Sequence, residues 1–396
     1  MNTEVTAKPK SVVIVAGESS GDAHAARLVT ELKKMDSTIS FRGMGGDNLR
    51  DAGVDVFIDM AKLSVMGFVE VLLKYNVIKK ELNRLKKNIS DNPPDLLILV
   101  DYQEFNQRLA AYAKGTGIKV LFYIGPSVWA WRPKRVYKMA KIVDHMAVIL
   151  PFEKKLYEDA DVPVTFTGHP LTDEVIADKT KQQARQQLQL ENPKIADRTT
   201  VGIFPGSRSS EIKRILPVLL ESAKIIKQLK PDVQFILPLA NTISNEELAV
   251  FQQELKVLDI AVTKAEFHDV IQACDVILTA SGTATLEIGL LEVPMVIVYK
   301  VSALTYYIMK NLAITKFIGL VNIVPQKSVI KEFIQHEATA SNISREALKI
   351  LDDKKYCDSI RHELSLLRHQ LGDDSHSGNG SKNVALLAFN MLNKKS

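Results

Sequence analysis

The chain has 396 residues, of which 46% are hydrophobic and 24% are charged, and its formal net charge is +5. This length exceeds what one hydrophobic core usually supports, so two domains are expected, and the ordinary composition predicts that most of the chain folds. The mild positive charge suits an anionic ligand or an acidic membrane surface. It argues against a nucleic-acid partner, whose binding protein would carry dense basic stripes.

Two further protein classes are excluded by local features. Met1–Lys10 contains no apolar stretch of the kind that signal peptides have, and no window reaches about 18 uninterrupted apolar residues, so no transmembrane helix is expected. Cys274 and Cys357 are far apart and lack metal-ligand spacing, which predicts thiols in a reducing compartment. Together these features predict a cytoplasmic protein.

The chain begins with a strand, a tight turn and a helix. Residues 11–17 form a short apolar, β-branched run that is typical of a buried parallel strand, and residues 23–34 have helical periodicity. The turn between them would lie at the carboxyl end of the strand, where doubly wound sheets bind ligands. Glu18 is therefore expected near a ligand crevice, whereas capping or structural roles are expected for Asp22 and His24.

An apolar segment and a basic segment adjoin each other after a second, glycine-rich strand end. Residues 63–73 are apolar, and the helix that follows is rich in lysine, a combination found at membrane interfaces and in acyl-chain grooves. An amphipathic helix packed on its sheet accounts for most of these residues. Met66 and Phe68 are expected to face lipid, because they belong to an apolar loop where loops are usually polar.

A candidate catalytic residue follows the next strand. Residues 95–100 are mostly apolar, and Asp101 is the first residue beyond them, the position at which α/β enzymes place reacting side chains. A partly buried carboxylate there could take a proton from a hydroxyl group as a general base. Glu104 is a competing candidate three residues later.

Both tryptophans of the chain lie in one loop after the strand at residues 119–123. Trp129 and Trp131 are interleaved there with Arg132 and Arg135. Such a surface suits a phosphorylated, amphipathic acceptor or a membrane interface. Stacking on a nucleic acid would use the same residue types, but one isolated cluster supports it only weakly.

The second half repeats the plan after a polar stretch, residues 171–200, which predicts the crossing between domains. A strand at residues 200–204 leads into a turn that contains Gly206, Ser207 and Arg208. A Gly-Ser-Arg turn at a helix start offers backbone donors and a fixed guanidinium, which suits a diphosphate. The turn is not a Walker loop, because GxxxxGK[ST] is absent.

A second candidate anion site begins at Ser281. It follows a buried strand, and Ser281, Gly282 and Thr283 open a helix whose first N–H groups and dipole attract anions. Glu287, about a turn and a half further on, could bind two hydroxyls of a ribose. A plain serine N-cap with a solvated glutamate explains this stretch equally well by itself, but the glycine turn at Gly206 in the same domain favours a nucleotide-sugar site, with a phosphate held beside a ribose.

The order of these motifs resembles the lipid-A-disaccharide synthase family along nearly the whole chain, from the first strand to beyond residue 322. The motifs that carry the resemblance are Ala-Gly-Glu-Ser-Ser-Gly-Asp (16–22), Leu-Ser-Val-Met-Gly-Phe-Val-Glu-Val-Leu (63–72), Pro-Ser-Val-Trp-Ala-Trp-Arg (126–132), Leu-Pro-Phe-Glu (150–153), Gly-His-Pro (168–170), Pro-Gly-Ser-Arg (205–208) and Ser-Gly-Thr-Ala-Thr-Leu-Glu (281–287).

The resemblance implies an α/β fold of the GT-B type, with two doubly wound parallel-sheet (Rossmann-like) domains facing an interdomain cleft. Residues 1–175 would form an N-terminal domain that binds the acceptor and faces the membrane, and residues 176–365 would bind the UDP-sugar donor. Residues 366–396 would pack on the N-terminal domain of the same chain or of a partner in a homodimer.

The implied reaction joins UDP-2,3-diacylglucosamine to the 6-hydroxyl of 2,3-diacylglucosamine 1-phosphate, giving a β-1,6 disaccharide and UDP. Asp101 matches the family's catalytic base, Arg208 would stabilise the leaving UDP, Glu287 would bind the ribose and Asn322 would contact the donor. Inversion at the sugar carbon fits a single displacement. The resemblance implies no cofactor and no tightly held metal. It also implies peripheral contact with the cytoplasmic face of the inner membrane.

Two departures from the family pattern bear on these roles. Glu104 stands where other members carry a second aspartate, and Val324 lies where an Ala-Gly pair commonly follows Asn322. Alternatives therefore stay open: another GT-B enzyme acting on UDP-N-acetylglucosamine, such as a peptidoglycan-precursor transferase or an epimerase, or a non-catalytic nucleotide-sugar sensor. The tryptophan loop favours a lipid acceptor over epimerisation, which has no acceptor.

Overall fold

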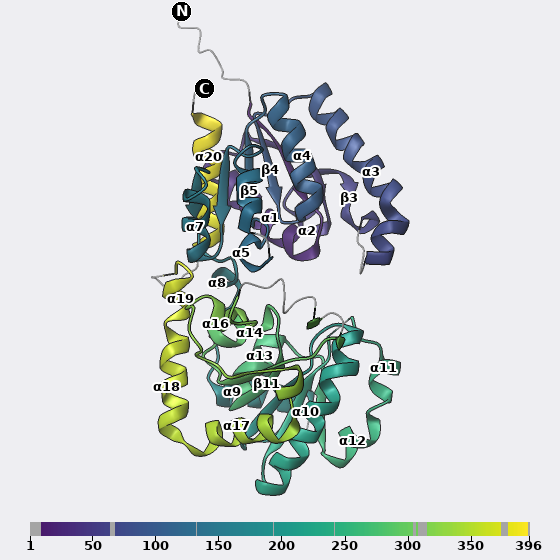
Figure 1. Ribbon diagram of the computed structural model, residues 1–396, viewed down its shortest axis with the longest axis vertical. Coiled ribbons are helices and arrows are strands. Elements are labelled where there is room, and N and C mark those ends of the chain that lie inside the picture. Colours follow the sequence, from purple (N-terminus) through teal and green to yellow (C-terminus); the bar gives the residue numbers. More distant parts are fainter. Residues whose placement is uncertain are drawn as a thin grey trace, which may run out of the picture. The chain divides into compact units, whose positions relative to one another are not determined.

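The computed structural model describes most of the chain and divides it into two compact units. One comprises the described parts of Met1–Asp173 and Leu371–Ser396, and the other comprises those of Glu174–Gln370 (Figure 1). The described residues are 9–63, 68–131, 133–192, 194–240, 242–303, 306–307, 315–373 and 379–394.

The first unit is built on a seven-stranded sheet in the order β3-β2-β1-β4-β5-β6-β7, and every strand pair in it is parallel. The strands are β1 (Ser11–Ala16), β2 (Ser40–Gly45), β3 (Asp55–Asp59), β4 (Leu96–Val100), β5 (Val120–Tyr123), β6 (His145–Val148) and β7 (Val164–Phe166).

Helices cover both faces of this sheet, which is why its strands are apolar at successive positions. Along β1, Val12 and Ile14 pack into one core with α1 and α20, whereas Val13 and Val15 pack into the core on the other face. The helices are α1 (Ser19–Met35), α2 (Asp47–Asp51), η1 (Met60–Lys62), α3 (Phe68–Asp91), α4 (Gln103–Gly115), α5 (Val128–Trp131), η2 (Pro133–Arg135), α6 (Val136–Met139), α7 (Pro151–Glu158), α8 (Leu171–Glu174, at the junction of the units) and α20 (Gly380–Asn393).

The C-terminal helix belongs to this first unit. α20 packs against α1, and its N-terminus is fixed by Asp173, whose carboxylate accepts hydrogen bonds from the N–H groups of Gly380 (3.0 Å) and Ser381 (2.9 Å). A carboxylate at that point satisfies two backbone donors that the helix itself leaves open. The last helix therefore contacts the first unit of its own chain.

The second unit repeats the architecture with a six-stranded parallel sheet in the order β10-β9-β8-β11-β12-β13. Its strands are β8 (Thr200–Phe204), β9 (Gln234–Pro238), β10 (Ile260–Thr263), β11 (Val276–Ala280), β12 (Met295–Tyr299) and β13 (Glu332–Ile334). Its helices are α9 (Lys181–Glu191), α10 (Ser209–Leu229), α11 (Asn245–Ala249), α12 (Gln252–Val257), α13 (Phe267–Ala273), α14 (Ala284–Leu290), α16 (Leu320–Ile323), η3 (Gln335–Glu337), α17 (Ala340–Asp352), α18 (Lys354–Ser365) and α19 (Leu367–Gln370).

The predicted parallel α/β architecture is confirmed, whereas the polar stretch at residues 171–200 is more structured than its composition suggests. It contains α9, which packs on α13. Arg185 of α9 is mostly buried and bonds Asp275 (2.6 Å) and Asp197 (3.0 Å). Polar residues here are used for ion pairs with the second unit, so α9 is part of that unit.

Among the described helices, none combines the length and the hydropathy that crossing a membrane requires.

Candidate functional site

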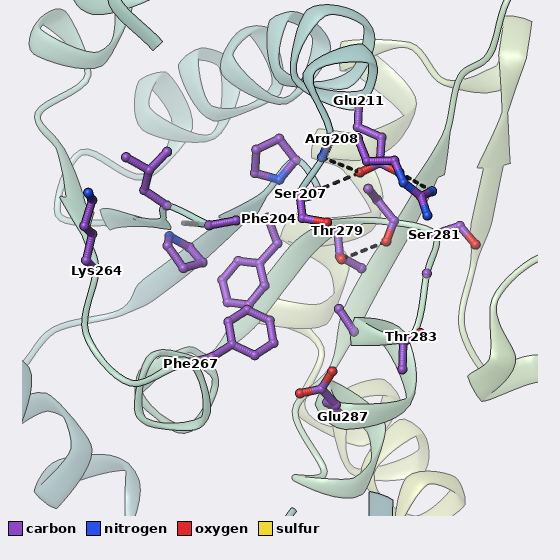
Figure 2. Close-up of a pocket in the computed structure, with 18 of the residues that line it drawn as sticks. Phe204, Ser207, Arg208, Glu211, Lys264, Phe267, Thr279, Ser281, Thr283 and Glu287 are labelled. Atoms are coloured by element: carbon purple, nitrogen blue, oxygen red, sulfur yellow. Dashed lines mark hydrogen bonds and ion pairs between the residues drawn. The ribbon is translucent and has the colours of Figure 1, made fainter. Parts of the chain in front are cut away.

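A cavity of about 600 Å³ opens at the carboxyl ends of the strands in the second unit (Figure 2). This is the edge at which parallel sheets bind ligands, because strand ends and helix N-termini meet there. Its lining residues come from the ends of β8, β9 and β11 and from the starts of α10, α13 and α14. They include Gly206, Ser207, Arg208, Ser281, Gly282, Thr283 and Glu287 from the predicted UDP site.

The turn at Gly206 is held by an acidic residue that the sequence analysis did not single out. One carboxylate oxygen of Glu211 accepts hydrogen bonds from the N–H groups of Ser207 (2.9 Å) and Arg208 (3.2 Å), and the other lies 3.4 Å from Arg208 Nη1. Gly206 has φ of +105°, and a Cβ there would lie 2.2 Å from the Glu211 carboxylate, so only glycine fits. The amides expected to cradle a phosphate therefore already bind Glu211.

The guanidinium of Arg208 remains available to a ligand. Its side chain is 76% exposed, and Figure 2 shows it at the cavity beside Ser281. The contact with Glu211 is an exposed i,i+3 ion pair, which contributes little by itself. An anionic ligand with two or three oxygens could compete for the same guanidinium with better geometry. This turn thus offers a cation, while its backbone serves the start of α10.

Free backbone donors are found instead in the Ser281–Ala284 segment. The N–H of Ser281 donates to Val298 O (3.2 Å), but those of Gly282, Thr283 and Ala284 have no acceptor in the described part of the chain. A Cβ placed on Gly282 would meet nothing within 4 Å, so the backbone borders open space. An anion could reach these three donors directly.

Glu287 is paired with a histidine that the sequence analysis did not identify. His268 Nε2, on α13, lies 3.1 Å from Glu287 Oε2, and both side chains are mostly buried. The pKa of His268 is raised above its usual value, chiefly by this hydrogen bond and against the effect of burial, with Glu266 and Asp178 adding to it. His268 thereby fixes one carboxylate oxygen of Glu287 beside the cavity. An aromatic pair, Phe204 and Phe267, lies next to them with ring centroids 5.4 Å apart.

Asn322 does not reach this cavity, so the expected donor contact needs correction. Its side chain is completely buried, and its amide nitrogen donates to Ile330 O (2.7 Å) and Glu332 Oε1 (2.8 Å). Its amide oxygen accepts from the N–H groups of Val329 (2.9 Å) and Ile330 (2.8 Å). Each polar group of Asn322 is used to fix the segment that leads into β13, which leaves none for a ligand.

A second cavity, of about 620 Å³, lies in the first unit at the carboxyl ends of β4 and β5. It combines apolar and charged side chains. Its lining residues are Glu18, Tyr75, Ile78, Lys79, Leu82, Asp101, Tyr102, Gln103, Glu104, Phe105, Arg108, Ile124, Gly125 and Ser127. Asp101 and Glu18, which the sequence analysis placed at this edge, are therefore brought together.

Asp101 occupies an unusual backbone conformation directly after β4. Its φ is +50° and that of Tyr102 is +46°, a region that non-glycine residues rarely adopt. Asn106 stabilises this turn, because its amide nitrogen donates to Val100 O (3.2 Å) and Asp101 O (2.7 Å). The packing around the turn holds the Asp101 side chain at the edge of the cavity.

The environment of Asp101 makes its carboxyl group a proton acceptor near neutral pH. Burial raises the pKa of Asp101 to about 6, and the nearby charge of Glu18 adds to the increase. A hydrogen bond from the N–H of Tyr102 and the proximity of His24 act in the opposite direction. A carboxylate with such a pKa is ionised at neutral pH and still more basic than an ordinary aspartate.

Two histidines of the first unit, His24 and His169, are held neutral. Burial, with Arg27 adding to it, lowers the pKa of His24 to about 4. Burial likewise lowers the pKa of His169 to about 3, and His169 Nδ1 accepts a hydrogen bond from the N–H of Leu171 (3.2 Å). Asp22, also completely buried, accepts bonds from the N–H groups of Gly46 (2.6 Å) and Asn48 (3.1 Å). Burial therefore keeps both histidines uncharged, and the Asp22 carboxylate holds the start of α2.

Trp129 and Arg135 were expected to face an acceptor or lipid, but neither lines the first-unit cavity. The indole N–H of Trp129 donates to Glu153 (3.1 Å), and its ring packs edge-on against Phe152. Glu153 is buried, which raises its pKa to about 7. Arg135 pairs with Glu104 at 3.2 Å. Trp129 therefore anchors its loop to α7, and Arg135 neutralises an acid at the cavity rim.

The other residues predicted to face lipid have no described side chains. Met66 and Arg132 lie outside the described residues, and Phe68 and Trp131 are described only as backbone at the start of α3 and the end of α5. Within the described ranges, no group of three or more histidine, cysteine, aspartate or glutamate side chains has an arrangement that could hold a metal ion.

Comparison with known proteins places this geometry in context. The family model described as Lipid-A-disaccharide synthetase matches residues 12–384. The lipid-A-disaccharide synthase of Geobacter metallireducens is 47% identical over 390 residues, which cover 98% of this chain and 99% of the relative. That of Nitrosococcus oceani is 43% identical over 385 residues, which cover 97% and 98%.

Solved structures share the fold at low sequence identity. The UDP-GlcNAc 2-epimerase from Neisseria meningitidis bound to UDP-GlcNAc has a TM-score of 0.65 at 14% identity, covering 96% of this chain and 100% of that chain. MurG from Acinetobacter baumannii has a TM-score of 0.58 at 13% identity, with coverage of 96% and 100%. At such identity the likeness concerns the fold alone, and it places both parallel-sheet units in a GT-B-like architecture.

Proposed function

Because the chain belongs to the lipid-A-disaccharide synthase family, we propose that its two cavities divide the work of that glycosyltransferase between them. The enzyme condenses UDP-2,3-diacylglucosamine with 2,3-diacylglucosamine 1-phosphate, forming a β-1,6-linked disaccharide 1-phosphate and UDP in lipid A biosynthesis. The second-unit cavity binds the donor, and the first-unit cavity binds the acceptor and holds the catalytic base.

The donor assignment is supported by the match between UDP and the groups around the second-unit cavity. The open N–H groups of the Gly282–Ala284 segment and the exposed guanidinium of Arg208 suit the diphosphate. Glu287, oriented by His268, is placed to accept hydrogen bonds from ribose hydroxyls. As the bond from the sugar to UDP breaks, negative charge grows on the diphosphate, and Arg208 together with these N–H groups stabilises it.

The catalytic assignment is carried by one observation, the partial burial of Asp101 at the end of β4, which raises its pKa to about 6. Asp101 takes the proton of the acceptor's 6-hydroxyl while that oxygen attacks the anomeric carbon of the donor sugar. The carbon–oxygen bond to UDP breaks as the new glycosidic bond forms, so the configuration inverts in a single displacement. Glu18 raises the basicity of Asp101 without replacing it.

Peripheral contact with the cytoplasmic face of the inner membrane is part of the proposal. It is supported by the acylated substrates and by α3, which carries the exposed apolar side chains Tyr75 and Val77 beside several lysines. Tyr75, Ile78 and Leu82 give the first-unit cavity an apolar wall on this helix, which suits acyl chains. We also propose a homodimer, since the family resemblance predicts one.

The decisive test is incubation of the purified protein with both acylated sugars, followed by mass analysis for the disaccharide 1-phosphate and UDP. We expect product only when both substrates are present. Equal efficiency with unacylated UDP-N-acetylglucosamine as donor would overturn the lipid-substrate assignment. Conversion of UDP-N-acetylglucosamine alone into an epimer would indicate the other enzyme class with this fold.

A further inference from the structure

Two cations in the first-unit cavity have no role in the mechanism above. Lys79 on α3 and Arg108 on α4 both line this cavity, and α3 and α4 pack against each other. Neither side chain has an ion-pair or hydrogen-bond partner in the part of the chain that the structure describes. By contrast, Arg135 at the rim is paired with Glu104 at 3.2 Å. Lys79 and Arg108 are thus cations that a ligand can use.

The acidic side chains of the same cavity form no ion pairs with Lys79 or Arg108 in the described part of the chain. Asp101 is held near the end of β4 by its backbone turn, and its charge interactions are with Glu18 and His24. Glu104 is paired with Arg135. The cavity therefore takes Asp101 and Glu18 from the loops after β4 and β1, its acidic end, and its free cations from α3 and α4, its basic end. Apolar side chains of α3 also line it. Its ligand should be amphipathic and should carry an anionic group away from Asp101.

We propose that Lys79 and Arg108 form the binding site for the anomeric phosphate of the acceptor. The inference rests on the proposed function, which places the acceptor in this cavity. The acceptor's phosphate monoester is its only charged group, and a guanidinium binds phosphate through two parallel hydrogen bonds, with a lysine adding a mobile second charge. Lys79 and Arg108 supply that combination from two different helices.

The positions of the two ends along α4 agree with one sugar ring between them. Gln103, the first residue of α4, and Arg108 both line the cavity, and a helix rises 1.5 Å per residue, so about 7.5 Å separates them along the axis. Asp101 immediately precedes this helix. The 1-phosphate and the 6-hydroxyl extend from C1 and C5, the two carbons that flank the ring oxygen of glucosamine. A phosphate held at Arg108 therefore keeps the hydroxyl within about one ring's width, on the side of the cavity where α4 begins and Asp101 lies.

This arrangement also protects the general base. A phosphate dianion close to Asp101 would raise the pKa of the carboxyl further and reduce its ionised fraction at neutral pH. Lys79 and Arg108 neutralise the phosphate at the basic end, so the acceptor can be held by its charge without protonating Asp101. The two cations are therefore binding and positioning residues, since neither touches the reacting atoms.

The test compares the acceptor 2,3-diacylglucosamine 1-phosphate with the same sugar lacking the phosphate. In the unaltered enzyme, the phosphorylated acceptor should have the higher kcat/KM. For Arg108→Ala we expect a loss of roughly ten- to a hundredfold in kcat/KM with the phosphorylated acceptor, the range typical of a charge-assisted hydrogen bond. Little loss is expected with the phosphate-free acceptor, so the ratio between the two should approach one.

Three further variants make the result specific. Lys79→Ala should lower the same ratio by a smaller factor, because its single ammonium group binds phosphate less directionally than a guanidinium. Arg108→Lys should restore part of the preference for phosphate, which a loss of folding would not do. Lys80→Ala removes an exposed lysine of α3 that does not line the cavity, so it should leave the ratio unchanged.

An unaltered preference for the phosphorylated acceptor in both Arg108→Ala and Lys79→Ala would overturn this inference. Failure of the proposed function would look different, since Asp101→Asn would then keep its turnover or the unaltered enzyme would form no disaccharide. If Asp101→Asn abolishes turnover while Arg108→Ala keeps the full phosphate preference, the base assignment stands and the phosphate site is wrong.

Discussion

The two cavities of this protein are similar in size and position but differ in how their polar groups are held. In the second unit, Glu211 and His268 tie the turn at Gly206 and the side chain of Glu287 into internal hydrogen bonds. In the first unit, Asp101 and Tyr102 have positive φ angles, and burial shifts the pKa values of Asp101 and His24 in opposite directions. Strained backbone angles and shifted pKa values are typical of catalytic sites, which suits the first-unit cavity. Side chains held by internal hydrogen bonds, as in the second-unit cavity, suit ligand binding.

This difference has a common physical origin in the strand ends. β4 delivers Asp101 from a completely buried strand, so its carboxylate emerges into a poorly solvated environment. β11 is equally buried, but it leads into the open Gly282 backbone, and the first acid after it is Glu287 on α14. The same topology thus places a carboxylate of raised pKa at the carboxyl ends of the strands in the first sheet. In the second sheet it places open backbone N–H groups at the equivalent position.

The largest predicted effect tests the reactive side of the comparison. Asp101→Asn removes the proton acceptor while keeping the shape of the side chain, so kcat should fall by about 10²–10⁴-fold, the usual contribution of a general base. UDP affinity should stay unchanged, because the proposed donor site lies in the other unit. Initial rates and calorimetry with UDP measure the two quantities. Glu104→Gln is the matched control, and a larger loss there would move the base to Glu104.

The second prediction tests the binding side. Arg208→Ala removes the exposed guanidinium at the second cavity, and we expect UDP to bind roughly ten- to a hundredfold more weakly, the range for a charge-assisted hydrogen bond. Arg208→Lys should recover only part of the affinity, because it lacks the bidentate fork. The Glu211 bonds to the turn's N–H groups do not depend on this side chain. Unchanged calorimetric affinity would remove Arg208 from the UDP site.

A third prediction uses the raised pKa of Asp101. Below about pH 6 the carboxyl is increasingly protonated, so kcat/KM should fall up to tenfold per pH unit on the acidic side. Stability should change in the opposite direction. The unfolded chain loses this proton near pH 4 and the folded chain near 6, so the contribution of Asp101 to folding becomes less favourable as pH rises through this window.

The measurement is a pH–rate profile paired with thermal unfolding of the unaltered enzyme and Asp101→Asn. Asp101→Asn should gain Tm relative to the unaltered enzyme at pH 8 and lose that advantage at pH 4. An acidic limb that is centred near pH 4, with no stability gain at pH 8, would show that Asp101 titrates as an ordinary aspartate. The two cavities would then differ less than their geometry indicates.

The sequence predicted the parallel sheets because most strands are continuous apolar runs bounded by turns. It did not predict β3 (Asp55–Asp59), β7 (Val164–Phe166), β10 (Ile260–Thr263) or β13 (Glu332–Ile334), which are the edges of the two sheets. Edge strands are short and partly polar, so their patterns are weak. Their place in the sheet is determined by long-range pairing that periodicity does not report.

For the candidate sites, the position of a residue just after a strand could be predicted from the sequence, whereas contacts between separate helices could not. Asp101 and Glu287 follow buried strands closely, and each lines a cavity. The partnership of His268 with Glu287 joins two helices that are separated in sequence, and no local pattern announces it. The spacing of Arg208 and Glu211, three residues apart at a helix start, is a capping signal that was available. Asn322 was assigned by resemblance, and its complete burial depends on tertiary packing.

The smallest predicted effect concerns His268 in the second unit. It bonds Glu287 beside the second-unit cavity, and its pKa is shifted by that contact. Its pKa is raised by Glu287, so the folded state holds the proton more tightly than the unfolded state, whose pKa is near 6.5. The stabilisation is fully present below pH 6.5 and is lost as pH rises through the folded pKa. His268→Gln should therefore lower the free energy of unfolding by about 0.5–1 kcal/mol at pH 6, with a smaller loss at pH 9.

UDP affinity extends the same test to binding. His268→Gln should weaken UDP binding a few-fold if the histidine orients Glu287 toward the ribose, and 2′-deoxy-UDP should show little of this loss. Thermal unfolding across pH and calorimetry with both nucleotides measure the two effects. A stability loss that is the same at pH 6 and pH 9 would mean that neutral His268 already makes the full contact. Glu287 would then be positioned by a hydrogen bond that does not depend on protonation of His268. Of the two cavities, only the one that contains Asp101 would then change its behaviour with pH in this range.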